Sequence, residues 1–174
     1  MINKKLEKPT NVDFENNASG EAPDGWVSWT KFQRLGANMI ISNKNPYNGT
    51  KSAMLHRTEG LKYGEIALTP RQYIDATPFR GRKIRFRAAA RAELVESDFA
   101  FIRLSIDPEP SDDEHEGLPP LSDSLDNYRV ESSEWSMYEI EAKVPDNADI
   151  ISYGIYPGDF GTAWLDAINV EIVE

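Results

Sequence analysis

Apolar and polar residues alternate with a period of two along most of this chain. The clearest stretch is 83–92, where Ile84 and Phe86 alternate with Arg85 and Arg87. Such alternation predicts a β-strand with one face in the core and the other facing solvent or a ligand. No stretch keeps a helical period. The segments with strand patterning are 11–15, 25–33, 38–42, 52–57, 64–69, 83–92, 99–107, 135–144, 150–156 and 162–173.

Short segments rich in Gly, Pro, Asn and Asp separate these predicted strands. About ten short strands with short turns are typical of two packed antiparallel sheets. The sequence therefore predicts an all-β fold, a single β-sandwich domain over residues 1–174. Turn residues at 145–149 and 158–161 predict that the last three strands form a meander. The pattern does not assign the segment 71–81 to a strand, and this segment is compatible with a short turn of helix.

The charge of the 174-residue chain is unevenly distributed. Between Asp107 and Asp126 there are eight acidic residues and no Lys or Arg, so this segment supplies most of the net charge of −10. The part from 108 to 124 also holds four prolines, which predicts a long exposed acidic loop. We expect no nucleic-acid partner, because binding phosphates requires a basic surface.

Several kinds of chemistry are excluded by composition. The chain has no cysteine, so it cannot form a disulfide, a thiolate metal site or a cysteine nucleophile. Its two histidines make a histidine-rich metal site poorly supported. No apolar run is long enough to span a membrane, and the start has no apolar segment typical of a signal peptide. We expect a cytoplasmic location if Met1 is the native start, and an extracellular or periplasmic one if a signal peptide has been removed.

Two groups of segments resemble known jelly-roll domains. The first group resembles the entry of galactose-binding-like jelly rolls, which include many carbohydrate-binding modules: 11–15 (NVDFE), 23–26 (PDGW) and 48–55 (NGTKSAML). The second resembles the accessory jelly-roll domain N-terminal to some bacterial tail-specific serine peptidases: 78–85, 126–128, 135–140, 144–145 and 161–166. The resemblance implies a galactose-binding-like jelly roll. The peptidase itself has no counterpart in the sequence, so no peptidase activity is expected.

This resemblance implies a non-catalytic module that binds carbohydrate or another small polar ligand, on the concave sheet or at the loop edge. The aromatic candidates for stacking on a sugar are Trp29, Tyr63, Tyr128 and Tyr156, and the candidates for hydrogen bonding are Arg87 and Arg103. The alternative for the arginines is cross-strand pairing with Glu139 and Glu141. The alternative function is a protein-interaction or structural module. A carboxylate-dependent hydrolase is a third hypothesis, although nothing in the sequence singles out a pair of acids.

Asp166 is the residue that most directly suggests a metal. It has the same strand parity as Trp164 and Ile168, which predicts a carboxylate on the core face that needs a partner. In carbohydrate-binding modules that this chain resembles, the matching aspartate often helps to hold a structural calcium ion. Here the matching partners are Glu15 and the oxygens of Asn48 to Lys51. The alternative is an Asp166 that is hydrogen-bonded to backbone amides or to an arginine.

The residue after Asp166 and three of the tryptophans give two further expectations. The closing motif of the family usually carries two consecutive acids, whereas Asp166 is followed here by Ala167, and this departure counts against calcium. The tryptophans Trp26, Trp135 and Trp164 are expected in the core, because parity and the family pattern agree for them.

Overall fold

The computed structural model describes residues 5–28, 38–57, 70–94, 100–108, 120–124, 128–156 and 161–174. Within these residues the chain forms ten β-strands and one short 3-10 helix, Thr77–Phe79. The strands are β1 (Asn38–Ser42), β2 (Ser52–Arg57), β3 (Gln72–Asp75), β4 (Lys83–Leu94), β5 (Ala100–Pro108), β6 (Ser122–Asp123), β7 (Arg129–Val130), β8 (Ser136–Lys143), β9 (Ala148–Tyr156) and β10 (Gly161–Ile172). None of the described residues belongs to a helix long and apolar enough to cross a membrane.

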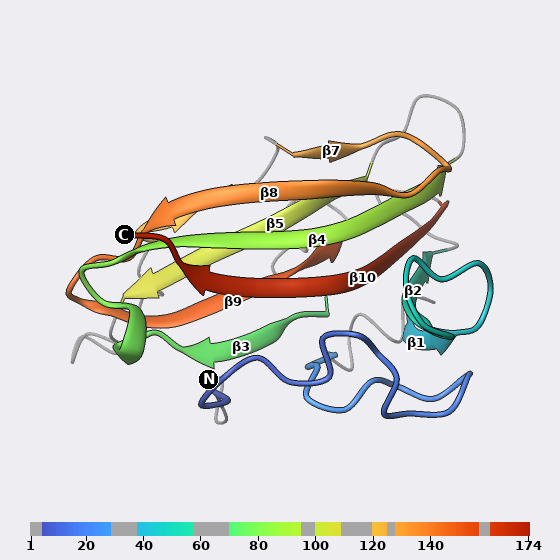
Figure 1. The fold of residues 1–174 in the computed structure, drawn as a ribbon, viewed down its shortest axis with the longest axis horizontal. Coiled ribbons are helices and arrows are strands. Elements are labelled where there is room, and N and C mark those ends of the chain that lie inside the picture. Colours follow the sequence, from blue (N-terminus) through green and yellow to red (C-terminus); the bar gives the residue numbers. More distant parts are fainter. Residues whose placement is uncertain are drawn as a thin grey trace.

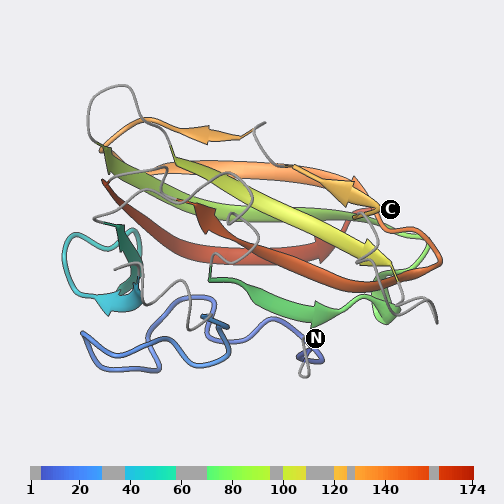
Figure 2. The same ribbon diagram turned by 180° about the vertical axis from the view of Figure 1, so that it is seen from behind.

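The strands form two antiparallel sheets that pack face to face (Figure 1). Sheet I has the order β1-β2-β10-β4-β8, and sheet II has the order β3-β9-β5-β6, with the short β7 also paired to β5. Sheet I lies toward the viewer in Figure 1, and sheet II lies toward the viewer in Figure 2. The predicted all-β jelly-roll sandwich of two antiparallel sheets is therefore confirmed.

The core lies between the sheets and is built by the alternation that the sequence shows. Ile84 and Phe86 of β4 and Ile102 and Leu104 of β5 are at most 2% exposed and belong to one apolar cluster. Because alternate side chains of a strand point to opposite faces, their polar neighbours lie on the outer faces of the sandwich. These outer faces are where a ligand can be bound.

The N-terminal segment closes one side of the sandwich. Leu6 exchanges backbone hydrogen bonds with β3, donating to Tyr73 and accepting from Asp75, while Ile41 of β1 exchanges bonds with Gly20 and Glu21. Edge strands of both sheets are thus covered by the same segment (Figure 1). The expected strand at 11–15 is instead a run of turns in this segment.

The predicted meander of the last three strands is wrong. β8 and β10 both pair with β4 in sheet I, whereas β9 lies between them in sequence but pairs with β3 and β5 in sheet II. The chain therefore crosses between sheets at each connection. Turn composition predicts that a chain reverses but not which sheet the next strand joins. The second of these turns, 158–161, lies largely outside the described residues.

A β-bulge in β10 reverses the strand parity after Asp166. The pairing with β4 runs regularly from Gly161 to Asp166, then shifts so that Asn169 is opposite Arg87. Ala163 and Leu165 point into the core before the bulge, and Ile168 points into the core after it. Trp164 and Asp166 consequently lie on the outer face of sheet I, so the expectation that they share the core face with Ile168 is wrong.

Candidate functional site

The outer face of sheet II carries a concentrated set of polar side chains. Tyr73 is opposite Ser152 of β9, Ser152 is opposite Ser105 of β5, and Ser105 is opposite Asp123 of β6. Paired residues project to the same face, so these four side chains form one row across four strands. We call this row and its polar neighbours the polar face: Arg71, Tyr73, Arg103, Ser105, Asp107, Asp123 and Ser152.

Two arginines of the polar face flank a glycine. Arg103 is opposite Gly154, and Arg71 passes over Gly154 from the other side, since a Cβ built on this glycine would lie 3.1 Å from Arg71 Cγ. The same Cβ would lie 2.6 Å from the carbonyl oxygen of Pro70, a contact that real Cβ atoms do not make. A glycine is therefore required where the start of β3 crosses β9, and its small size lets both guanidinium groups approach the serine row.

Hydrogen bonds hold these side chains in place. Arg103 forms a bidentate ion pair with Asp123, with Nε 3.0 Å from Oδ1 and Nη2 2.5 Å from Oδ2. Arg71 Nη1 donates to Ser152 Oγ at 3.2 Å, and Ser105 Oγ donates to Asp107 Oδ1 at 3.1 Å. Fixed rotamers of this kind reduce the entropy that a bound ligand must overcome.

Much of the polar face is withdrawn from water, although it points away from the core. Arg71 is 6% exposed and Ser152 is fully buried, whereas the Arg103 and Asp123 side chains keep 11% and 18% of their area exposed. Burial lowers the pKa of the Arg71 guanidinium and raises the pKa of the Asp107 carboxyl. Charged groups in such surroundings make stronger hydrogen bonds than they do in water.

An aromatic pair stands beside this face. Phe101 is opposite Tyr156 on the same side of sheet II, and their ring centroids are 4.8 Å apart. The Arg57 guanidinium lies 5.3 Å from the Tyr156 ring centroid, and Arg71 lies 5.6 Å from that of Tyr73. A guanidinium group thus contacts the ring of each of these two tyrosines.

The ligand candidates named from the sequence fall in different places. Arg103 lies on the outer face of sheet II, whereas Tyr156 is 5% exposed and belongs with Phe101 to the apolar cluster, so its ring is not available to stack on a sugar. Tyr128 packs against the core and lines a hollow of about 160 Å³ together with Asp123 and Ile140. Trp29 and Tyr63 lie outside the described residues.

Arg87 lies on the outer face of sheet I, away from the polar face. Its Nε is 3.4 Å from Glu139 Oε2, and the neighbouring Arg85 donates to Glu141 at 2.8 Å. These are the cross-strand ion pairs that the sequence offered as the alternative for the arginines. Arg103 does not form such a pair with Glu139 or Glu141, because its partner is Asp123 of sheet II.

Three important residues of the polar face were missed as site candidates: Arg71, Asp107 and Asp123. Asp123 was assigned to the acidic loop at 108–124, but Ser122–Asp123 form β6 and pair with β5, so the end of that expected loop is a strand. Residues 109–119 lie outside the described residues. The alternation of Arg71, Tyr73 and Asp75 with Gln72 and Ile74 was the signal that could have identified β3.

The residues expected to hold calcium do come together, but their oxygens accept hydrogen bonds. Asp166 is fully buried, and its Oδ2 accepts the backbone N–H groups of Tyr47 and Asn48, both at 3.1 Å. Glu15 Oε1 accepts the N–H groups of Thr50 at 2.7 Å and Lys51 at 3.0 Å. Asn48 and Lys51 therefore present backbone donors to these carboxylates. No cluster of three acids or histidines suited to a metal occurs among the described residues.

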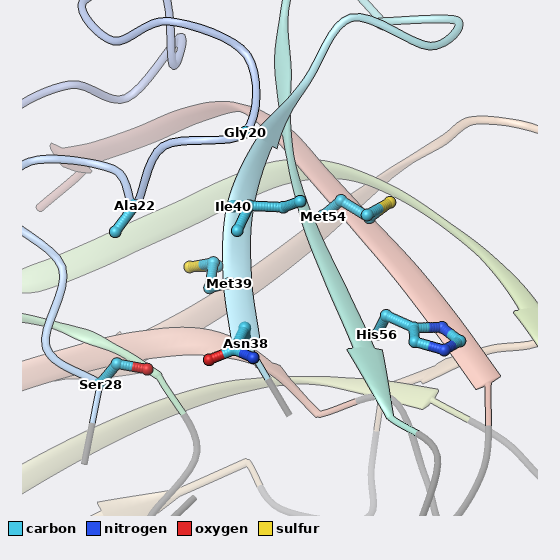
Figure 3. A pocket seen from close by; sticks show the side chains of 8 residues that line it. All are labelled: Gly20, Ala22, Ser28, Asn38, Met39, Ile40, Met54 and His56. Atoms are coloured by element: carbon cyan, nitrogen blue, oxygen red, sulfur yellow. The ribbon is translucent and has the colours of Figure 1, made fainter. Parts of the chain in front are cut away.

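A second hollow lies at the edge of sheet I. It encloses about 510 Å³ and is lined mainly by Met39, Ile40 and Met54, with His56 at one side (Figure 3). The Nδ1 atom of His56 forms a 2.7 Å hydrogen bond with Thr162 Oγ1. Few polar groups converge on this hollow, so it offers less for recognition than the polar face.

Trp164 is buried as expected, at 4% exposed, but on the outer face of sheet I, and Trp135 is only partly buried, contrary to expectation. The Arg91 guanidinium lies 3.6 Å from the Trp164 ring centroid and 5.4 Å from that of Trp135, on the outer face of sheet I. Trp26 does contact the core, with its ring centroid 5.5 Å from that of Phe14 and 6.0 Å from that of Tyr153. Stacking of a tryptophan on arginine replaces burial between the sheets.

Comparisons with known proteins agree on the fold. No protein-family model matches the chain. A family 4 carbohydrate-binding module has a TM-score of 0.61 and 16% identity, over 94% of this chain and 98% of that one. The C-terminal family 22 carbohydrate-binding module of Clostridium thermocellum Xyn10B has a TM-score of 0.60 and 13% identity, over 95% and 96%. The chain thus has the jelly-roll fold of carbohydrate-binding modules.

One curated relative is similar in sequence. The uncharacterized HTH-type transcriptional regulator YbfP of Bacillus subtilis (strain 168) is 27% identical over 137 residues, which are 78% of this chain. The match spans 44% of that protein's length, so this chain corresponds to less than half of its relative.

Proposed function

We propose that this chain is a non-catalytic module that binds a carbohydrate across the polar face of sheet II. The observation that carries the proposal is the arrangement of Arg71 and Arg103 around Gly154, next to the serine row and Asp107. The side chains are fixed, largely desolvated and directed outward, which is the state in which polar groups recognise a ligand with little loss of entropy.

The chemistry of the polar face suits a sugar. Each sugar hydroxyl can both donate and accept a hydrogen bond, and this face offers arginine donors and carboxylate acceptors, held in place by serine hydroxyls that are at most 1% exposed. The two arginines are balanced by Asp107 and Asp123, so the charges cancel. A face without net charge favours a neutral saccharide over an acidic one.

The geometry of Asp123 supports the non-catalytic part of this proposal. Both oxygens of Asp123 accept hydrogen bonds from Arg103, and this bidentate pair ties up the carboxylate that a glycoside hydrolase would need as nucleophile or base. The solved structures with the same fold support a binding role, since they include carbohydrate-binding modules and a xylan-binding domain.

Calorimetric titration of oligosaccharides selected on a glycan array tests the proposal. We expect Arg71→Lys and Arg103→Gln each to weaken binding at least tenfold, because hydrogen bonds to charged groups contribute about 1.5–3 kcal/mol. Arg87→Gln, on the opposite sheet, is the control and should bind as the unchanged protein does. Absence of any glycan ligand, or equal weakening by Arg87→Gln, would overturn the proposal.

A second candidate function follows from the curated relative. YbfP is named as an HTH-type regulator, and the described residues of this chain contain no α-helix, so the shared part is not the helix-turn-helix. In this second candidate function, the β-sandwich is the part of a larger regulator that binds a soluble sugar. Tight binding of mono- or disaccharides without retention on insoluble polysaccharide favours sensing, and the reverse result favours a polysaccharide-binding module.

A further inference from the structure

Three distant parts of the chain meet beside the β10 bulge: the N-terminal segment 11–17, the loop between β1 and β2, and the bulge itself. The backbone N–H of Ile168 donates to Val12 at 3.1 Å, which joins the bulge to the N-terminal segment. Glu15 and Asp166 join the loop to the other two parts through the hydrogen bonds described above. This junction is where the resemblance places a structural calcium ion.

The carboxylates at the junction are poorly suited to bind calcium. A calcium ligand must direct an oxygen lone pair at the ion, and calcium requires six to eight such oxygens. Glu15 Oε1 and Asp166 Oδ2 each already accept two N–H groups. Glu15 Oε2 accepts the Thr50 hydroxyl at 2.6 Å, and Asp166 Oδ1 accepts the N–H of Ala167 at 2.7 Å. Positive hydrogen atoms thus occupy most of the positions where the ion's charge would lie.

A cation is nevertheless present at this junction, and it belongs to the chain. Lys51 Nζ donates to the backbone carbonyl of Asn17 at 2.7 Å and to that of Glu15 at 3.1 Å. Backbone carbonyls gathered around a positive charge are typical of calcium sites, and an ammonium group supplies three donors for the same oxygens. The Lys51 charge also helps, after the Thr50 hydrogen bonds, to lower the pKa of Glu15.

We propose that the Lys51 ammonium replaces the structural calcium ion and makes the junction independent of metal. It joins the N-terminal segment to the β1–β2 loop, while the backbone amide groups of that loop donate hydrogen bonds to Glu15 and Asp166. The loss of the second acid after Asp166 fits this replacement, because a single positive charge needs less negative charge around it than Ca²⁺ does.

Thermal unfolding with and without calcium tests this inference. We expect the melting temperature of the unchanged protein to agree within about 1 °C in EDTA and in millimolar CaCl₂, because the junction at Lys51 offers no vacant ion site to couple binding to folding. Lys51→Met keeps the apolar stem but removes two charged hydrogen bonds, so it should lower the melting temperature by about 4–8 °C. Lys44→Met, an exposed position in the same loop, is the matched control and should have little effect.

Two outcomes would overturn the proposal. One is a rise of several degrees when calcium is added to the unchanged protein, which would demonstrate an ion site beside Lys51. The other is a Lys51→Met variant as stable as Lys44→Met. If Lys51→Met does not fold, calorimetric titration of calcium into the chelator-treated unchanged protein decides the question, since saturable binding contradicts the proposal and its absence supports it. Neither experiment depends on carbohydrate binding.

Discussion

At the scale of single residues, burial decides what the charged groups can do. Asp107 and Arg71 sit on an outer face, yet both have pKa values displaced by burial in the direction that disfavours their charged forms. On the exposed outer face of sheet I, a hydrogen bond to Glu141 raises the pKa of Arg85, and hydrogen bonds from Lys83 and Arg85 lower the pKa of Glu141. Arg71 and Asp107 belong to the face where we propose that a ligand binds, and Arg85 and Glu141 form a solvated cross-strand pair.

Asp107 gives a prediction about pH. Burial raises the pKa of its carboxyl above the ordinary 3.8, opposed by the Ser105 hydrogen bond and by Arg71 and Arg103. The folded protein therefore holds this proton more tightly than the unfolded chain, and the contribution of Asp107 to stability falls as the pH rises through that window. We expect Asp107→Asn to be least stabilising near pH 3 and most stabilising near about pH 7, relative to the unchanged protein.

Urea denaturation at several pH values measures this difference. Asp146→Asn, at an exposed position, is the control and should show no such trend. A free energy of unfolding that changes equally with pH in Asp107→Asn and in the unchanged protein would contradict the assignment.

At the scale of elements, the bulge of β10 has the largest effect. It inserts one extra residue after Asp166, so that Trp164 and Asp166 face outward while Ile168 faces inward. The outward Trp164 stacks on Arg91, and the outward Asp166 anchors the loop that contains Tyr47 and Asn48. One local irregularity thereby links a strand of the sheet to the junction at Lys51.

The bulge also gives a stability prediction. Ala167 has a φ of 48°, in the left-handed region that costs an alanine energy and a glycine almost none. We expect Ala167→Gly to raise the free energy of unfolding by roughly 0.5–1 kcal/mol. Ala142→Gly in the regular strand β8 should lower it by a similar amount. Chemical denaturation of both variants tests the prediction, and a destabilised Ala167→Gly would show that the bulge conformation carries no strain.

At the scale of the whole molecule, one core joins both sheets. The apolar cluster includes residues of β1, β4, β5, β9 and β10, so neither sheet can lose its partner without exposing apolar area. We therefore expect a single cooperative thermal transition, with equal calorimetric and van't Hoff enthalpies. Two resolved transitions in scanning calorimetry would show that the sheets, or the covering N-terminal segment, unfold separately.

The amino-acid sequence by itself determined the fold class and the inward face of the regular strands. Alternation is a local property, because successive side chains of any strand point to opposite sides, and β4, β5 and β8 follow it over most of their length. The outward position of Arg103 was predictable for the same reason, and so was the cross-strand pairing of Arg85 and Arg87 with glutamates.

Only the tertiary structure decided which strands became neighbours and which side chains met. The polar face requires β3, β9, β5 and β6 to lie side by side, and no local pattern specifies that Arg71 and Arg103 approach each other across Gly154. The bulge reverses the parity of β10 directly after Asp166, whose carboxylate accepts the amide groups of a distant loop. Lys51 donates to two backbone carbonyls that lie 34 and 36 residues away in the sequence and come within reach only in the folded chain. Strand pattern depends on neighbours in sequence, whereas sites depend on neighbours in space.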